Sequence, residues 1–210
     1  MIHVAAQADE PEVRATRSGF SRLALVAALG AGAIAARPVA GVIRLGSALA
    51  ASPSKAQDAR ILQLVLQLEY TQVAFYEEAL RGASLRGKLR QFAQTALGHE
   101  RAHLAAIRKA LGAKAGPRPS FDFGRATKDP GAFTQAAIRL EDLAVAGYNG
   151  QATNLTPATL GAAATIVSVE ARHAAWVRAI AGESAAPEPV DKPMTATEVL
   201  TGLHRIGLKA

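Results

Sequence analysis

Two stretches of the sequence share one pattern: Glu100-Arg101-Ala102-His103 and Glu170-Ala171-Arg172-His173. In each, a glutamate precedes a histidine by three residues, so on a helix both side chains would lie on one face. The residues that follow also recur at the same offset of 70 positions: Ala105, Arg108 and Gly112 as Ala175, Arg178 and Gly182. The pattern therefore belongs to an internal repeat.

The repeat continues upstream of each stretch, at an offset of 72 positions. Its shared residues are Leu68, Glu69, Val73, Ala74 and Tyr76, which reappear as Leu140, Glu141, Val145, Ala146 and Tyr148. Each half thus predicts one helix with one repeated glutamate and a second helix with a Glu-x-x-His pair.

Helical periodicity and capping signals predict four long helices. Ser54 with Gln57 resembles a capping box, and Asp129-Pro130 and Thr156-Pro157 are typical helix starts. Gly82-Ala83-Ser84 and Gly112 interrupt the pattern. The expected helices cover about residues 54–81, 85–111, 130–153 and 157–181, with a short fifth helix over 195–206.

The connections predict the topology. Three-residue links make the first and second helices antiparallel neighbours, and likewise the third and fourth. The middle loop, residues 112–128, has enough residues to cross the bundle, since a 26-residue helix is about 39 Å long and 17 extended residues reach about 55 Å. We expect an all-α four-helix bundle over residues 51–183, ordered hairpin, long crossover, hairpin. Residues 184–210 would form a Pro-rich linker and the short C-terminal helix.

The amino-acid composition excludes several classes of functional site. The chain is 50% apolar, 20% charged and 5% aromatic, which is typical of a globular protein and favours helices. Cysteine is absent, which excludes disulfides, thiolate zinc sites, iron–sulfur clusters and cysteine nucleophiles. The net charge of +7 is dispersed, without blocks of basic residues, and so predicts a solvated surface, not a nucleic-acid-binding face.

Glutamates from both repeats lie in the predicted core. Their neighbours one and two turns away are mostly apolar for Glu69, Glu100, Glu141 and Glu170. Four buried carboxylates would repel one another and lose several kcal/mol of hydration each. Two divalent cations would balance their charge. One glutamate from each of two helices with Glu-x-x-His from the other two is the known pattern of di-iron and di-manganese carboxylate bundles.

On these residues the sequence resembles the ferritin-like superfamily over about residues 54–207, within it the group of exported bacterial and plant desiccation-related proteins. The resemblance implies that Glu100 and Glu170 bridge two iron ions, with manganese as the alternative metal. Terminal ligands would be Glu69 with His103 and Glu141 with His173. Tyr76 and Tyr148 would donate hydrogen bonds to the ligands, or would be ordinary core tyrosines. The implied reaction partners are O2 or peroxide, in iron oxidation or oxidative-stress protection. The sequence leaves monomer, dimer and cage open, so a homo-oligomer is one of the alternatives.

Three alternatives remain at this point. The bundle could be a non-catalytic structural or desiccation-protective module. His99-Glu100-Arg101-Ala102-His103 is also a literal zinc-peptidase motif, although Val169 breaks it in the repeat. A DNA-protecting ferritin relative is the third, suggested only by the positive charge.

The N-terminal fifty residues predict an export signal. A 14-residue apolar run, Leu23–Ala36, follows three arginines and is too short for a stable membrane span. Ala48-Leu49-Ala50 resembles a signal-peptidase site, and residues 16–22 resemble a degenerate twin-arginine signal, with a Sec signal as the alternative. The expected location is outside the cytoplasm. An apolar N-terminal helix on a cytoplasmic protein is the competing interpretation.

Overall fold

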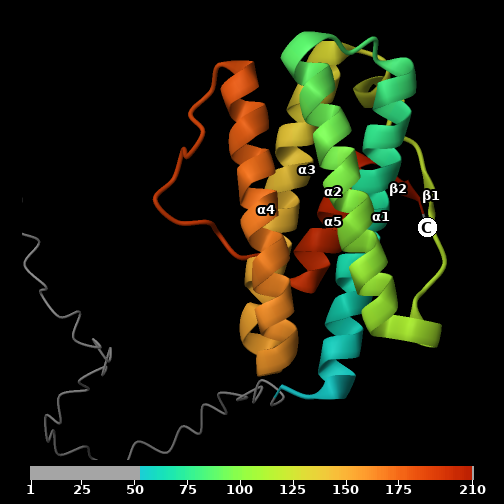
Figure 1. Ribbon diagram of the computed structural model, residues 1–210, viewed down its shortest axis with the longest axis vertical. Helices are drawn as coiled ribbons and strands as arrows, with labels where there is room; N and C mark the ends of the chain where they lie inside the picture. Colours follow the sequence, from blue (N-terminus) through green and yellow to red (C-terminus); the bar gives the residue numbers. More distant parts are fainter. Residues whose placement is uncertain (1–52, 210) are drawn as a thin grey trace, which may run out of the picture. The chain divides into compact units, whose positions relative to one another are not determined.

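The computed structural model describes residues 53–209, and the predicted export signal lies outside them. Within this range the chain forms five α-helices and two very short strands (Figure 1). The helices are α1 (Lys55–Gly82), α2 (Gly87–Leu111), α3 (Pro130–Gln151), α4 (Pro157–Ala181) and α5 (Ala196–Ile206). The strands are β1 (Ser120–Phe121) and β2 (Leu208–Lys209), which pair antiparallel. The prediction of an all-α bundle with a short C-terminal helix is confirmed.

Local capping explains where most helices begin. The Ser54 hydroxyl accepts a 3.2 Å hydrogen bond from the Gln57 backbone N–H, and the Asp129 carboxylate accepts one of 2.8 Å from the Ala132 N–H. Before α5, Thr195 and Glu198 form a reciprocal capping box. These bonds satisfy N–H groups that a helix start leaves without an intrahelical partner.

Two details differ from the sequence prediction. The Thr156 side chain does not cap α4; its hydroxyl donates instead to the Asp58 carboxylate at 2.5 Å, which ties the start of α4 to α1. The third helix was expected to reach about residue 153, but α3 ends at Gln151 and a 3-10 turn covers residues 152–154. The contact with Asp58 explains why Thr156 does not cap α4. The tighter 3-10 turn explains why α3 ends early.

The crossover is fixed to the bundle by aromatic packing and by the strand pair. Phe123 is buried and meets Phe75 edge-on with ring centroids 5.4 Å apart, while Phe121 stacks on Phe123. Next to β2, Gly207 has φ +150°, and a Cβ there would lie 2.6 Å from the Asp122 carbonyl oxygen. Glycine therefore allows the close approach of the C-terminal segment to the crossover.

The C-terminal helix α5 is part of the core. Val199 and Leu203 are fully buried, and α5 packs against α3. Gly150 on α3 lies so close to Met194 that a Cβ would be 1.8 Å from its carbonyl oxygen. This docking covers the face of α3 that would otherwise be open to solvent.

Two apolar clusters fill the bundle, one on each side of its middle. The cluster toward the α1–α2 turn is rich in aromatic rings: Phe75, Tyr76, Phe92 and Phe133. The other cluster, toward the start of α1, is mainly aliphatic, with Ile61, Val65, Leu66 and Ile107. A layer of polar residues separates the two. Over the described residues, no helix is long and apolar enough to cross a membrane.

Candidate metal centre

Six side chains from four helices meet in the polar layer at the middle of the bundle. Each predicted ligand is there: Glu69 from α1, Glu100 and His103 from α2, Glu141 from α3, and Glu170 and His173 from α4. All four glutamates have no exposed surface, His173 is 2% exposed, and His103 is partly buried. The three-residue spacing, close to one full turn, places glutamate and histidine on the same inward face of α2 and of α4.

The six residues form two overlapping groups that could each hold a metal ion. The first contains Glu69 and His103, the second Glu141 and His173, and both contain Glu100 and Glu170. Within each group the ligand atoms lie within 4.8 Å of one another. The two groups thus share two carboxylates, Glu100 and Glu170.

Distances around the two histidines show the near-symmetry of the layer. His103 Nδ1 lies 3.0 Å from Glu100 Oε2, 2.9 Å from Glu170 Oε1 and 3.7 Å from Glu69 Oε2. His173 Nδ1 lies 3.0 Å from Glu100 Oε1, 3.5 Å from Glu141 Oε2 and 3.9 Å from Glu170 Oε2. Each imidazole therefore faces both shared carboxylates and one terminal carboxylate.

Two tyrosines hold the terminal carboxylates from the opposite hairpin. Tyr148 on α3 donates a 2.6 Å hydrogen bond to Glu69 Oε1 on α1, and Tyr76 on α1 donates to Glu141 on α3. Burial, the facing glutamate charge and the hydrogen bond raise the pKa of each tyrosine well above its ordinary value. Both hydroxyls therefore stay protonated and act as donors.

Gln72 is a site residue that the sequence prediction did not assign. Its amide nitrogen donates to Glu170 Oε2 at 2.9 Å and to Glu141 Oε2 at 3.2 Å, and its side chain is fully buried. The signal was present, because Gln72 follows Glu69 at the same three-residue spacing as the histidines. It was hidden because the repeat has Ala144 at the matching position.

His99 lies beside the centre and belongs to neither ligand group of the described residues. Its ring stacks on the His173 ring with centroids 5.1 Å apart, and its Nδ1 lies 2.9 Å from His173 Nε2. This contact with Nε2 fixes the orientation of the His173 ring and leaves its Nδ1 facing the carboxylates. The geometry thus pairs His99 with His173, whereas a zinc-peptidase site would require His99 and His103 to share one ion.

Proton affinities in the layer respond to burial and to the crowding of carboxylates. Burial opposes a charge on His103, but hydrogen bonds with Glu100 and Glu170 raise its pKa to about 10. Similarly, contacts with Glu100, Glu141 and Glu170 outweigh burial and raise the pKa of His173 to about 12. Two imidazolium groups therefore balance part of the carboxylate charge when no cation is bound.

The pKa values of the carboxylates shift in opposite directions. Burial and the neighbouring carboxylates raise the pKa of Glu69 and of Glu141 above the ordinary glutamate value. Burial also opposes ionisation of Glu170, but hydrogen bonds with His103 and His173 hold its pKa below the ordinary value. A cluster with such opposed shifts stores protons that a cation would displace.

Several buried polar atoms in the layer make no hydrogen bond of good geometry, although three of them lie within 3.0 Å of an oppositely charged atom. They are Glu69 Oε2, Gln72 Oε1, Glu100 Oε1, Glu170 Oε1 and His173 Nδ1. An unpaired buried polar atom costs about 1–3 kcal/mol, and Glu69 Oε2 and Gln72 Oε1 have no close partner, so the layer has unused capacity for a ligand. Four of these five atoms belong to the two ligand groups. Oxygen and imidazole donors without thiolate fit hard or borderline cations such as iron and manganese.

Solvent reaches one side of the centre between α2 and α4. A surface pocket of about 390 Å³ is lined there by His99, Ala102, His103, Val169, Arg172, His173 and Trp176. Both histidines of the ligand groups border it. Small molecules therefore have a short route to the imidazole edge of the layer.

Comparison with known families agrees with this geometry. The family model described as ferritin-like domain matches residues 57–183, a range that includes all six predicted ligands. No curated protein shows significant sequence similarity to the chain.

Proposed function

The chain belongs to the ferritin-like domain family, and we propose that it binds two divalent metal ions, iron or manganese, and uses them to react with O2 or peroxide. The observation that carries the proposal is the pair of overlapping ligand groups, buried in one layer and sharing two carboxylates. The biological role would be iron oxidation or protection against oxidative stress.

Ligand roles follow from which residues the groups share. Glu100 and Glu170 would bridge the two ions, because only these two belong to both groups. Glu69 and His103 would complete one ion, and Glu141 and His173 the other. Four carboxylates bring four negative charges, which two divalent ions neutralise without protons.

The surrounding residues would hold the ligands in place. Tyr148 and Tyr76 orient the terminal carboxylates, Gln72 orients Glu141 and Glu170, and His99 orients His173. Such partners restrict each ligand to one rotamer, and removing one typically costs 10–100-fold in metal affinity. The apolar clusters on both sides keep bulk water away from the buried carboxylates.

A ferrous pair, when bound, supplies two electrons for the reduction of O2 or peroxide. The residues of the chain give a small oxidant access to the centre and keep the tyrosine hydroxyls protonated. The pocket between α2 and α4 admits a small oxidant to the side where His103 and His173 lie. The phenolic protons of Tyr76 and Tyr148 remain on the tyrosines, because each hydroxyl faces a carboxylate that disfavours a second negative charge.

A non-catalytic, stress-protective bundle is the second candidate. The ion pairs of both histidines with Glu100 and Glu170 favour it, since they give the metal-free layer internal charge balance. The two candidates differ in what happens when iron and oxygen are supplied together.

Oxygen uptake separates these candidates. The full chain would be loaded with two equivalents of Fe(II) without air, mixed with dissolved O2, and followed with an oxygen electrode. We expect uptake faster than that of Fe(II) alone in the same buffer, and a return to the buffer rate in Glu100→Ala/Glu170→Ala. A parent chain that matches the buffer rate while staying folded would favour the structural role.

Export is a separate proposal that rests on the sequence of residues 1–50. Cell fractionation and N-terminal sequencing of the mature chain would test it. A new N-terminus near residue 51 in the exported fraction is the expected result, and a full-length cytoplasmic protein would contradict it.

A further inference from the structure

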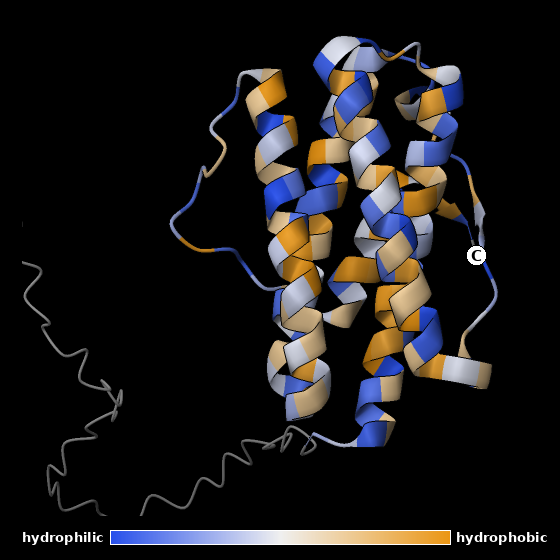
Figure 2. Ribbon diagram, in the orientation of Figure 1, coloured by the Kyte–Doolittle hydropathy of each residue, from blue (hydrophilic) through white to orange (hydrophobic). Residues whose placement is uncertain are grey.

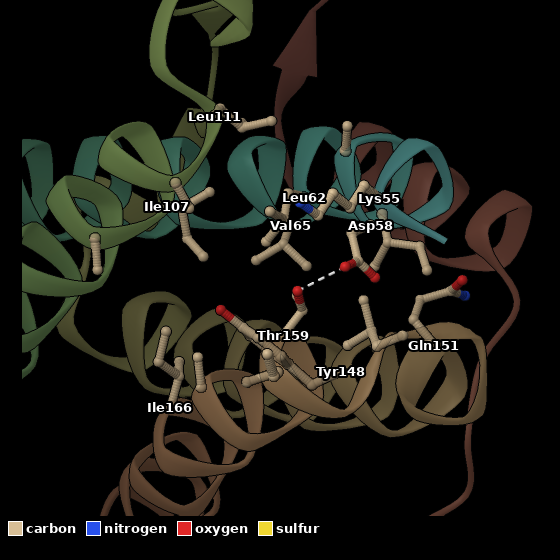
Figure 3. Close-up of a pocket in the computed structure, with 18 of the residues that line it drawn as sticks. Lys55, Asp58, Leu62, Val65, Ile107, Leu111, Tyr148, Gln151, Thr159 and Ile166 are labelled. Carbon is tan, nitrogen blue, oxygen red and sulfur yellow. Dashed lines mark hydrogen bonds between the residues drawn. The ribbon is translucent and has the colours of Figure 1, made fainter. Parts of the chain in front are cut away.

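A second cavity lies between the two hairpins, near the beginning of α1 (Figure 3). Its volume is about 480 Å³, which is within the range of small-molecule binding pockets. All four long helices line it, mainly with aliphatic and alanine side chains. In Figure 3 Val65 and Leu62 of α1 face Ile166 and Tyr148 across the space.

The cavity ends one helical turn from the candidate metal centre. Val65 precedes Glu69 by four residues, Ile166 precedes Glu170 by four, and Ile107 follows His103 by four. Tyr148 forms part of the wall and donates its hydroxyl hydrogen to Glu69. A molecule in the cavity would therefore contact the residues next to the ligand layer.

The internal repeat explains why this volume near the beginning of α1 is open. At the other end of the bundle, Phe92 and Trp176 fill the equivalent volume, with ring centroids 5.3 Å apart. At the offset of 70 positions, Phe92 corresponds to Ala162 and Trp176 to Ala106. Both alanines line the cavity. Small residues where the other half has two large aromatic rings leave the volume open.

The polar groups around the cavity favour an anionic ligand. Asp58 is its one acidic lining residue, and its carboxylate already accepts hydrogen bonds from the Thr156 N–H and from the Thr156 and Thr159 hydroxyls at 2.5–2.9 Å. Lys55 and Lys114 are exposed at the rim, and neither pairs with a carboxylate among residues 53–209. The nearby half of α4, residues 157–169, carries no charged residue and is drawn mostly in white and orange in Figure 2.

We propose that this cavity binds an aliphatic carboxylate, a fatty acid of medium to long chain. The hydrocarbon chain lies against Ala106, Ala162 and Ile166, and the carboxylate lies beside Lys55 and Lys114. This goes beyond the proposed function, because binding in the cavity requires no metal ion. Each methylene group buried should strengthen binding about fourfold.

Calorimetric titration of the metal-free full chain with decanoate tests the proposal. We expect one decanoate per chain, bound about fifteenfold tighter than octanoate, because two methylenes are added. 1-Decanol, which has the same chain without the charge, should bind more weakly. No heat of binding for decanoate, or equal affinity for decanoate and octanoate, would overturn the proposal.

A matched pair of variants locates the ligand. Ala162→Phe restores the ring found in the other half and should reduce decanoate affinity at least tenfold. Ala164→Phe makes the same change on an exposed position of α4 outside the cavity, and should leave affinity unchanged. Circular dichroism checks that both variants fold. Equal affinity of folded Ala162→Phe and the parent would contradict the assignment.

Charge removal tests the anchoring of the carboxylate. Lys55→Gln/Lys114→Gln should lower the affinity for decanoate several-fold and leave the affinity for 1-decanol unchanged. Unchanged affinity for decanoate would contradict the proposal.

Size-exclusion chromatography tests the alternative occupant of the cavity, which is a second copy of the chain. A parent dimer that Ala162→Phe dissociates, with no decanoate binding, would overturn the fatty-acid assignment. Because all arms use metal-free protein, their outcome is independent of the iron experiment.

Discussion

The Tyr148 hydroxyl on α3 donates a 2.6 Å hydrogen bond to Glu69 on α1, across the interface between the two hairpins. Tyr76 and Glu141 make the reciprocal bond in the opposite direction. Each hairpin thus supplies the donor for the terminal carboxylate of the other. The docking of the hairpins and the geometry of the candidate metal centre are therefore coupled.

Removal of the Tyr148 hydroxyl should affect both stability and metal binding. In Tyr148→Phe the buried Glu69 oxygen loses its partner, and we expect a loss of about 1–3 kcal/mol in the free energy of unfolding. Metal affinity should fall roughly 10–100-fold because Glu69 is no longer held in place. Thermal unfolding and metal titration measure the two effects.

Tyr70→Phe is the matched control for that prediction. Tyr70 donates to the Gly116 carbonyl and accepts from Arg108, away from the ligand layer. It should change stability and leave metal affinity unaltered. Equal loss of metal affinity in both variants would show that Tyr148 acts through the fold alone.

Gln72 should make the two ion positions unequal. It contacts Glu141 and Glu170 but has no counterpart in the other half, where Ala144 stands. We expect Gln72→Leu to lower the affinity for the ion near Glu141 and His173 more than the affinity for the ion near Glu69 and His103. Stepwise titration with Mn(II), followed by electron paramagnetic resonance, would resolve the two events. An equal loss at both steps would contradict this role.

Substitution of His99 and of Glu170 separates the dinuclear centre from a zinc-peptidase site. His99→Ala should leave two metals bound per chain, since His99 only contacts the outer nitrogen of His173. Glu170→Ala should lose at least one metal, because Glu170 belongs to both ligand groups. Elemental analysis of the two purified variants is the measurement. The reverse pattern would support the peptidase.

Asp58 should stabilise the fold in a pH-dependent way. Burial opposes its charge, but hydrogen bonds from Thr156 and Thr159 outweigh burial and lower its pKa below the ordinary 3.8. A lowered pKa in the folded state means that the stabilisation is present above pH 3.8 and is lost as the pH falls through the folded-state pKa. Asp58→Ala should cost about 1–3 kcal/mol at neutral pH.

Urea unfolding at several pH values tests this prediction. The difference in unfolding free energy between parent and Asp58→Ala should be constant near neutrality and shrink at acid pH. Asp191→Ala changes an exposed aspartate in the Pro-rich segment and serves as the control with no such difference. A gap that stays constant down to the acid limit would contradict the role of the ionised carboxylate.

The helices and the faces on which their ligand residues lie were predictable, because both depend on local periodicity. The three-residue spacing of Glu100 and His103 places both on one face of any helix, and the repeat predicts the same for Glu170 and His173. Loop lengths predicted the hairpins and the long crossover between them.

Other features depend on how the two hairpins face each other, which local patterns do not specify. The crossed tyrosine bonds, the double contact of Gln72 and the bond between Thr156 and Asp58 all join residues from different hairpins. The cavity beside Ala106 and Ala162 depends on the same interface. The metals and the export signal stay predictions.

Metal content per chain tests the central claim most directly. The full chain would be loaded with excess Fe(II) without oxygen, freed of unbound iron and counted by elemental analysis, beside Glu100→Ala/Glu170→Ala. Two ions in the parent and fewer in the variant are the expected result, because the two shared carboxylates hold both positions together. A parent chain that keeps its helical circular dichroism spectrum but binds no iron would contradict the account.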